Sequence, residues 1–251
     1  MNSQTLPISN HPVPLWQPAN LHAIGRRFDR QHPRNVLRWA LTTYAQEIAL
    51  ATGFGPSGIV LMHMVSELRP RTTVFYLQTD LLFPESLELR DKLARRLGIT
   101  FSEVRPDISL LEQARSHGYN LWQSDPDLCC KIRKVLPLRR FLGGKKAWIT
   151  GIRRDQSPSR AGIQVVDWDG ANELVKVCPL AHWNRDQVWN YLLEHDLPYN
   201  PLHDHGYPSV GCMPCTRAAD PGSDERAGRW AGSQKTECGI HVQPVDLQQA
   251  M

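Results

Sequence analysis

Apolar residues recur with two different periods along the first 150 residues of the chain. Short apolar runs of strand length alternate with longer stretches in which apolar residues recur at helical spacing. The runs predict strands over residues 47–52, 72–78, 99–104 and 146–152. The stretches predict helices over residues 36–45, 59–68, 84–98, 109–118 and about 129–142. This alternation is typical of βαβ units, so we expect an α/β fold with a doubly wound, mostly parallel sheet.

The pattern changes after residue 155. Asp169-Gly170, flanked by apolar residues, indicates a hairpin, and residues 184–196 predict a final amphipathic helix. Residues 1–20 hold four prolines without apolar periodicity, and residues 217–237 hold few core-forming residues. We therefore expect a disordered leader over 1–20, a folded domain over 21–216 and a flexible C-terminal segment over 217–251.

Composition narrows the function classes. With 41% hydrophobic and 22% charged residues, the 251-residue chain reads as an ordinary soluble protein. It has no apolar run of membrane-spanning length and no signal peptide, so a cytoplasmic location is expected. A net charge of +4 favours small anions, and neither nucleic acid nor a membrane is expected as a partner. Six cysteines in a cytosolic chain favour metal binding or thiol chemistry over disulfides.

A glycine-rich loop follows the first predicted strand. Gly53, Gly55 and Gly58 match G-x-G-x-x-G between a strand and a helix, and Asp80 lies near the end of the next strand, as in a dinucleotide site. Pro56 removes one backbone N–H from the loop, and no P-loop lysine follows. The loop therefore predicts an anion site of backbone amides at a helix N-terminus. The alternative is a tight turn that binds nothing.

Two close pairs of cysteines supply four thiols. Cys129 and Cys130 are adjacent, and Cys212 and Cys215 form a CxxC motif. Four thiolates suit a tetrahedral zinc ion or an iron–sulfur cluster. Adjacent cysteines point their side chains apart, which favours a cluster in which each binds a different iron. Zinc, a thioredoxin-like use of the CxxC motif and unligated buried cysteines remain alternatives.

The two remaining cysteines have different surroundings. Cys238 has Lys235 and His241 close in sequence, and cationic neighbours lower the pKa of a thiol and so favour its nucleophilic form. The alternative is a solvated cysteine in a tail. Cys178 ends an apolar strand, which is typical of a small core residue.

Several separated motifs together resemble a known family. "CCKIRK", "GIRRDQSPSR", "NPLHDHGYPSVGCMPC" and "KTECGIH" are similar to those of assimilatory adenylyl-sulfate reductases, the [4Fe–4S] type of the phosphoadenylyl-sulfate reductase family, over about residues 35–241. The resemblance implies the adenine nucleotide alpha hydrolase-like (PP-loop) fold. It also implies a thioredoxin-dependent reduction of adenosine 5′-phosphosulfate to sulfite and AMP, in sulfate assimilation and cysteine biosynthesis.

The resemblance also implies a role for each motif. Cys129, Cys130, Cys212 and Cys215 would ligate a [4Fe–4S] cluster within domain 21–216, and Cys238 would be the nucleophile that becomes an S-sulfocysteine. Lys134 and His241 would complete the catalytic set. A thiolate that attacks a phosphosulfate meets like charge, so cations are expected there; a solvated charged face is the alternative. The substrate-binding residues expected are Thr52, Gly53, Gly55, Ser57, Arg160, Arg226 and Arg229.

Two positions depart from the family pattern. Gly53 stands where serine is common, so Thr52, Ser57 or the backbone would contact the phosphate, and Gln78 stands at an acidic position. Three other functions are kept open: a zinc-containing PP-loop enzyme, a nucleotide-binding regulator with a redox-sensing cluster, and a reductase for 3′-phosphoadenylyl sulfate. Colour and metal content separate a cluster from zinc, and sulfite release separates an enzyme from a regulator. The oligomeric state is open, a homo-oligomer included.

Overall fold

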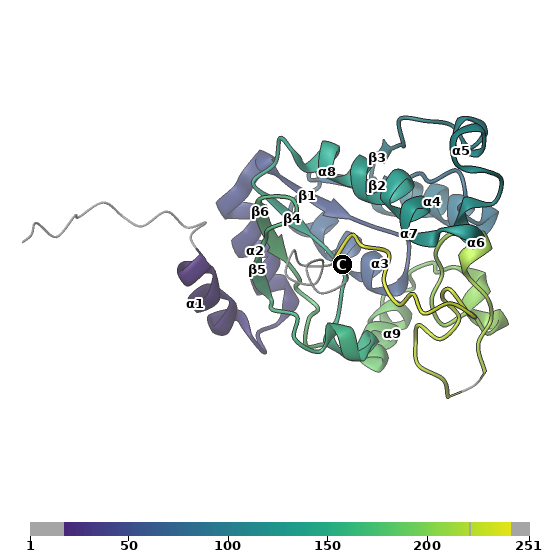
Figure 1. Cartoon of the computed structure of the whole chain (residues 1–251). Coiled ribbons are helices and arrows are strands. Elements are labelled where there is room, and N and C mark those ends of the chain that lie inside the picture. The colour runs from purple at the N-terminus through teal and green to yellow at the C-terminus, as the bar shows by residue number, and fades with distance from the viewer. Residues whose placement is uncertain (1–17, 221, 242–251) are drawn as a thin grey trace, which may run out of the picture.

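A six-stranded sheet forms the centre of the computed structural model, which describes residues 18–220 and 222–241 (Figure 1). Its strand order is β3-β2-β1-β4-β6-β5, and every neighbouring pair is parallel except β5 and β6. The mostly parallel sheet confirms the predicted fold class. The strands are β1 (Ile48–Ala51), β2 (Thr73–Leu77), β3 (Phe101–Val104), β4 (Ala147–Ile149), β5 (Val166–Asp169) and β6 (Leu174–Val177).

The helices begin and end where local chemistry favours it. Several of them have proline in the first turn, where its missing N–H is tolerated. Capping boxes start two more, through Ser109 with Glu112 and through Asn184 with Gln187. The helices are α1 (Pro18–Phe28), α2 (Pro33–Tyr44), α3 (Pro56–Leu68), α4 (Pro84–Leu97), α5 (Leu110–His117), α6 (Leu121–Ser124), α7 (Pro126–Cys130), α8 (Leu136–Leu142) and α9 (Arg185–Glu194).

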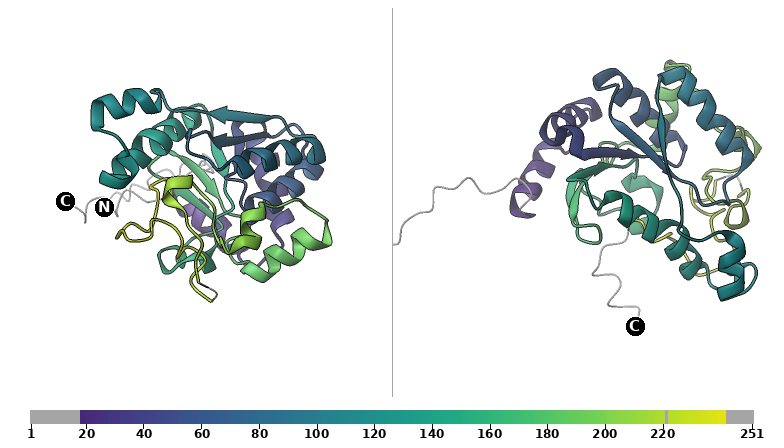
Figure 2. Two further views of the ribbon diagram at one scale, coloured as in Figure 1. Left: turned by 90° about the vertical axis from the view of Figure 1, so that its right-hand side faces the viewer. Right: turned by 90° about the horizontal axis from the view of Figure 1, so that it is seen from above.

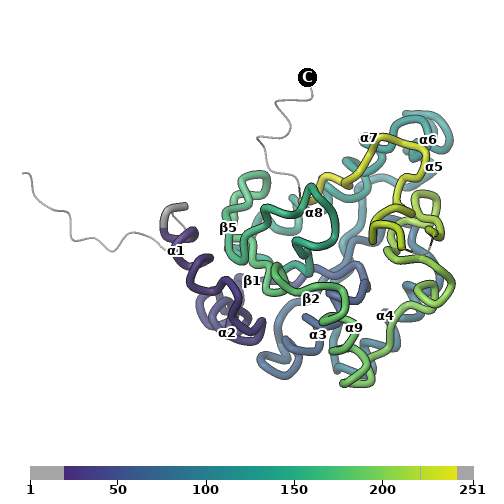
Figure 3. The backbone as a smooth tube through the Cα atoms, turned by 90° about the horizontal axis from the view of Figure 1, so that it is seen from below, coloured from purple at the N-terminus to yellow at the C-terminus, as the bar shows by residue number. Residues whose placement is uncertain are grey.

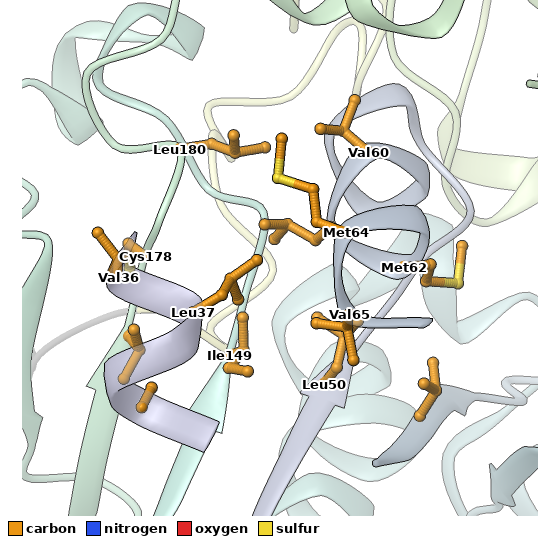
Figure 4. Close-up of a cluster of buried hydrophobic side chains, with 14 of the residues drawn as sticks. Val36, Leu37, Leu50, Val60, Met62, Met64, Val65, Ile149, Cys178 and Leu180 are labelled. Carbon is orange, nitrogen blue, oxygen red and sulfur yellow. The ribbon is translucent and has the colours of Figure 1, made fainter. Parts of the chain in front are cut away.

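Helices cover both faces of the sheet (Figure 2). On one face, side chains of α2, α3, α4 and α9 pack against β1 and β4; Leu37, Leu50 and Ile149 meet there in the main core (Figure 4). On the other face, Phe75 and Trp148 pack against α8. Central parallel strands are buried on both faces, which explains why their sequences read as continuous apolar runs.

Cys178 lies inside the main core. It is 1% exposed and packs among the side chains of α2 and α3 (Figure 4). Burial raises the pKa of its thiol to about 11. The prediction of a small core residue is confirmed, and Cys178 is kept apart from the chemistry of the other cysteines.

The predicted hairpin forms as β5 and β6, but its connection is longer than the Asp-Gly pair suggested. Asp169 ends β5, and its carboxylate accepts hydrogen bonds from the backbone and side-chain nitrogens of Asn172 at 3.2 and 2.9 Å and from Nε1 of Trp148 at 3.0 Å. These bonds hold a four-residue connection between Asp169 and Leu174. Strand β6 then pairs parallel with β4, so the hairpin extends the main sheet.

Helix α1 corrects the boundary of the predicted leader. Residues 18–20 form its first turn, although the sequence placed them in the leader. The physical reason is that Leu21, Ile24 and Phe28 recur at helical spacing and pack against the main core. The rest of the predicted leader, residues 1–17, lies outside the described residues.

The described part of the C-terminal segment crosses the carboxyl ends of the strands. From residue 217 to 241, with residue 221 left out, it contains no helix or strand and runs beside α7 toward α8 (Figure 3). Lys235 pairs with Asp127 of α7, and Ile240 packs on the core under α8. The flexibility of this segment and the division at residue 216 stay predictions. Among the described helices, none has the length and apolar character that crossing a membrane requires.

Candidate active site

A cavity of about 260 Å³ opens at the carboxyl ends of β1, β2 and β4. The chain runs from β1 outward to β3 and then returns to place β4 on the other side of β1, so the cavity lies where the strand order reverses. Open α/β sheets bind ligands at such switch points. The glycine loop, the loop after β4, the CxxC loop and the C-terminal segment all contribute to its lining.

The glycine loop forms one end of the cavity. Residues 52–58 all line it, and no described side chain caps α3, so N–H groups of its first turn are open to an anion. A methyl group at Gly58 would stand 2.8 Å from Oγ1 of Thr52, whereas Gly53 and Gly55 have no neighbour within 4 Å of that position. Gly58 therefore serves strand–helix packing, and the other two leave room for a ligand.

The two hydroxyls of the loop have separate functions. Oγ1 of Thr52 accepts a hydrogen bond from the N–H of Phe54 at 3.0 Å and fixes the turn. Oγ of Ser57 accepts from Arg153, so its own proton stays free to be donated to an anion. Arg153 is 2% exposed and also binds Asp155 and Glu225, at 2.8 and 2.6 Å. Sequence reasoning missed Arg153, although it lies within the "GIRRDQSPSR" motif.

Asp80, which follows the second strand as the acid of a Rossmann-type site does, is already paired with other side chains. The Asp80 carboxylate forms salt bridges with Arg133 at 2.6 Å and with Arg105 at 2.7 Å. Oε1 of Gln78 accepts from the N–H of Asp80 at 3.2 Å. Both side chains hold the turn after β2, and the Asp80 carboxylate is engaged by two arginines.

His203 lines the cavity and was not predicted. Its Nδ1 lies 2.7 Å from the carbonyl oxygen of Tyr207, which can only accept, so Nδ1 carries the proton. Nε2 is buried and has no hydrogen-bond partner among the described residues. Burial lowers the pKa of His203, which favours a neutral ring with an acceptor nitrogen. Its place in "NPLHDHGYPSVGCMPC" was the available signal.

The two cysteine pairs come together beside the cavity. Cys129, Cys212 and the partly buried Cys215 share an apolar cluster with Leu81 and Leu121. The CxxC loop is held by a hydrogen bond of 2.7 Å from the N–H of Met213 to the carbonyl of Leu81. The chain thus joins its second cysteine pair to the segment that follows β2.

Cys130 is buried next to the other thiols. Burial raises the pKa of Cys130 to about 12 and that of Cys129 to about 11. The sulfur atoms of Cys212 and Cys215 raise the pKa of Cys129 further. A buried group of thiols favours either protonation or a bound cation.

The chemistry of the four thiols is compatible with a multi-iron cluster. Within residues 18–220 and 222–241, no three His, Cys, Asp or Glu side chains form a group that could hold one metal ion. A zinc ion needs about four ligands within roughly 2.3 Å of one point. In a [4Fe–4S] cluster each thiolate binds a different iron, so the sulfur atoms stand further apart. Four thiols in an apolar setting match that cluster in number and chemistry.

A π-helical turn directs two basic side chains in different directions. Lys131–Val135 forms this turn between α7 and α8, within the helical stretch that the sequence predicted over 129–142. Arg133 is 1% exposed and binds the carbonyl of Thr79 at 2.7 Å. Lys134 lines the cavity. Burial would lower the pKa of Lys134, but the nearby sulfurs, that of Cys212 above all, raise it.

Cys238 lines the same cavity as Lys134. Burial would raise the pKa of the Cys238 thiol, but Lys134, the N–H of Ile240 and Arg229 outweigh burial and lower it. Arg229 lies over the ring of Trp230, 4.6 Å from its centre, and its Nε has no hydrogen-bond partner among the described residues. The structure thus places a thiol beside two cations in one cavity.

His241 and Lys235 do not supply the positive charge expected of them. The His241 ring stacks on Trp148 at 5.5 Å, and its Nδ1 has no hydrogen-bond partner among the described residues. Burial, reinforced by Lys176 and Arg160, lowers the pKa of His241 well below its usual value. A neutral imidazole therefore lines the cavity. Lys235 pairs with Asp127, outside the cavity lining.

Arg160 and Arg226 line the cavity, but both are hydrogen-bonded to a carboxylate of the same chain. Arg160 donates from two nitrogens to the two oxygens of Glu237, each at 2.7 Å. Arg226 donates to the same carboxylate at 3.1 Å. Sequence reasoning brought both arginines to the site and missed Glu237, the residue before Cys238.

The family follows from comparison with known proteins. Residues 47–218 match the model of the phosphoadenosine phosphosulfate reductase domain. The chain belongs to this family. An adenosine 5′-phosphosulfate reductase of Salinibacter ruber is 51% identical over 95% of both chains. One of Bacillus mycoides is 47% identical over 83% of this chain and 90% of its own.

Two solved structures share the fold of this chain. A phosphate complex of the phosphoadenylyl-sulfate reductase from Candida auris superposes with a TM-score of 0.70 at 29% identity, over 85% of this chain and all of that one. The FMN adenylyltransferase of Candida glabrata reaches a TM-score of 0.54 at 19% identity, over 91% of this chain and 82% of its own, and shares the fold alone. The resemblance predicted from the motifs is confirmed at the level of family and fold.

Proposed function

We propose that this family member reduces adenosine 5′-phosphosulfate to sulfite and AMP, with thioredoxin as the reductant and an S-sulfocysteine on Cys238 as the intermediate. The observation that carries the proposal is that Cys238, Lys134 and the glycine loop line one cavity. The names of the relatives with 51% and 47% identity support the substrate. A cytoplasmic location and a homo-oligomer stay predictions.

The cavity offers a matching surface for each part of the nucleotide. Phe54 and Tyr76 provide an apolar wall for the adenine, and the neutral His203 provides an acceptor for an N–H or hydroxyl group. The open amides of α3 and the Ser57 hydroxyl suit the α-phosphate. The sulfate would then lie toward Lys134 and Arg229, on the side of Cys238.

The reaction balances over three successive attacks by thiolates. The Cys238 thiolate attacks sulfur, a sulfur–sulfur bond forms, and the bond from sulfur to the bridging oxygen breaks, so that AMP leaves with the electron pair. A thiolate of thioredoxin then attacks the Cys238 sulfur and expels sulfite. The second thioredoxin thiol resolves the mixed disulfide and restores Cys238. The two electrons that reduce sulfate to sulfite come from the thioredoxin dithiol, which ends as a disulfide.

Cys129, Cys130, Cys212 and Cys215 would hold a [4Fe–4S] cluster. When bound, the cluster would supply negative charge beside the cavity. Lys134 would balance that negative charge, because its ammonium lies near both cysteine pairs and near Cys238. Its position links the cysteine pairs to the reacting sulfur.

Metal content tests the cluster. Anaerobically purified protein is expected to contain about four iron and four sulfide per chain and to absorb near 400 nm, because Cys129, Cys212 and Cys215 share one cluster and Cys130 adjoins Cys129. Cys130→Ser should lose most of the iron. Cys178→Ala should keep it, since Cys178 is also buried but lies in the main core. Stoichiometric zinc in the native protein would contradict the cluster and favour the zinc-containing alternative.

A sulfite assay with both nucleotides tests the proposed function. With reduced thioredoxin, kcat/KM for adenosine 5′-phosphosulfate is expected to exceed that for the 3′-phosphorylated nucleotide by about tenfold or more, roughly 1.4 kcal/mol. The reason is that the adenosine 5′-phosphosulfate reductase of Salinibacter ruber is 51% identical to this chain and the fungal phosphoadenylyl-sulfate reductase 29%. Equal values would contradict the preference. Binding of nucleotide without sulfite would favour a regulator.

A further inference from the structure

Arg153 is a buried arginine that lies behind the glycine loop. Its side chain is 2% exposed, and it is not one of the described residues that line the cavity. Its guanidinium donates a hydrogen bond to Oγ of Ser57, which does line the cavity. Any effect of Arg153 on a nucleotide in the cavity therefore passes through Ser57.

The loop after β4 brings Arg153 to the glycine loop. A methyl group at Gly151 would stand 3.0 Å from Cβ of Ser57 and 3.1 Å from the backbone nitrogen of Gly58, so the two loops approach closely where residue 151 has no side chain. Two residues later, the N–H of Arg153 donates to Oε1 of Gln156 at 3.0 Å and fixes the backbone there. The side chain of Arg153 thus starts next to the first turn of α3.

Two carboxylates fix the guanidinium of Arg153. Its Nε donates to Asp155 at 2.8 Å, and a terminal nitrogen donates to Glu225 of the C-terminal segment at 2.6 Å. Two negative charges thus lie against one positive charge, so the charge of Arg153 is already balanced within the chain. Because a guanidinium is planar and rigid, these bonds also set the direction of the N–H group that reaches Ser57.

We propose that Arg153 is a positioning residue for the phosphate of the nucleotide, which acts by turning the hydroxyl proton of Ser57 toward the cavity. A guanidinium has donors and no acceptor, so the Ser57 oxygen accepts from it and the Ser57 proton must be directed elsewhere. No described residue accepts that proton. Pro56 removes one N–H from this turn, and the oriented hydroxyl supplies a donor beside it. The inference rests on the proposed function and deepens its anion site.

A rival interpretation makes Arg153 only a structural tie. In that case its bond to Glu225 holds the C-terminal segment against the core, and its bond to Ser57 has no effect on the ligand. The two interpretations differ in which part of the nucleotide is affected. Loss of a tie would disturb the cavity wall and weaken adenosine and AMP alike. Loss of a phosphate-positioning residue would weaken AMP and leave adenosine unaffected.

The test measures the Kd of AMP and of adenosine for the anaerobic holoenzyme. Arg153→Lys keeps the positive charge but has no planar fork, so it cannot hold Ser57, Asp155 and Glu225 together. We expect the Kd for AMP to rise about tenfold, as for the loss of a hydrogen bond to a charged group. The Kd for adenosine should stay within about threefold of the parent value. With adenosine 5′-phosphosulfate, KM should rise as the Kd for AMP does and kcat should change little, because the phosphate is bound before and during the reaction.

Two further variants show whether Arg153 acts through Ser57. Ser57→Ala should raise the Kd for AMP about tenfold as well, and Arg153→Lys added to it should weaken AMP little further, because the two residues act as one unit. Arg154→Lys is the matched control. Arg154 is the next residue, pairs with Asp29 at 2.9 Å and is not one of the described residues that line the cavity. It should bind AMP and adenosine as the parent does.

The outcomes are separable. An unchanged Kd for AMP in Arg153→Lys, or an equal loss of affinity for AMP and adenosine, would overturn the inference. If Arg153→Lys does not fold, Asp155→Asn decides by the same criteria, because it leaves the arginine in place and loosens one of its two carboxylate supports. A parent protein that binds AMP but releases no sulfite would instead overturn the proposed function, and the comparison of AMP with adenosine would still test Arg153.

Discussion

Cys238→Ser is expected to lower sulfite formation below roughly a thousandth of the parent rate, as removal of a catalytic nucleophile does. The hydroxyl of serine is a far weaker nucleophile than a thiolate at neutral pH. The structure adds a specific reason, because Lys134 and Arg229 lower the pKa of this thiol against the effect of its burial. A serine at position 238 would stay protonated. Among the described residues, the cavity has no other thiol outside the two cysteine pairs.

A single turnover without thioredoxin shows the role directly. The parent protein should release one equivalent of AMP and gain the mass of one SO3 group on the "TECGIH" peptide, and added thioredoxin should remove it. Cys238→Ser should show neither event. It should still bind AMP and keep the absorption near 400 nm, since Cys238 belongs to neither cysteine pair. Sulfite release by Cys238→Ser at near-parent rates would mean that thioredoxin attacks the nucleotide itself.

Much of the fold was predictable because its signals are local. The apolar runs of β1, β2 and β4 and the prolines and capping residues of the helices can be read within a few neighbouring positions. Helix α1 was missed because its apolar residues are few and follow a proline-rich stretch. The partner of β6 was not predictable either, because pairing with β4 depends on the packing of the whole sheet.

The site was predictable where residue type alone carries the chemistry. Cysteine pairs and a glycine loop stand out in any context, and the structure brings both to one region. The charges could not be assigned in this way. Arg160 pairs with Glu237, which lies 77 positions away in the sequence, and no local signal indicates this ion pair. The neutral state of His241 depends on burial, which its neighbours in sequence do not reveal.

Lys134→Ala is expected to slow turnover far more than it lowers stability. The lysine lies in the cavity with Cys238, and its charge acts where the attacking thiolate and the sulfate bring negative charge together. Loss of one preorganised charge of this kind costs about 2–4 kcal/mol of transition-state stabilisation. That range corresponds to a fall of roughly 30- to 900-fold in kcat/KM. The melting temperature should change little, because no described carboxylate pairs with Lys134.

A second readout distinguishes this role from a general loss of positive charge. Lys134 lowers the pKa of Cys238, so its removal raises that pKa and leaves less thiolate at any pH below it. Alkylation of Cys238 at neutral pH should therefore slow in Lys134→Ala. Lys131→Ala is the matched control, since Lys131 is exposed on the same π-helical turn and does not line the cavity. Its turnover and alkylation should match the parent.

The iron content decides how the loss of activity is interpreted. Lys134 is not a ligand, so Lys134→Ala should keep the iron of the parent while its turnover falls, which places the effect on the reaction itself. Loss of iron together with activity would instead make the lysine a support of the cysteine pairs. Activity within about threefold of the parent, well under 1.4 kcal/mol, would show that the charge of Lys134 does not act on the reacting sulfur.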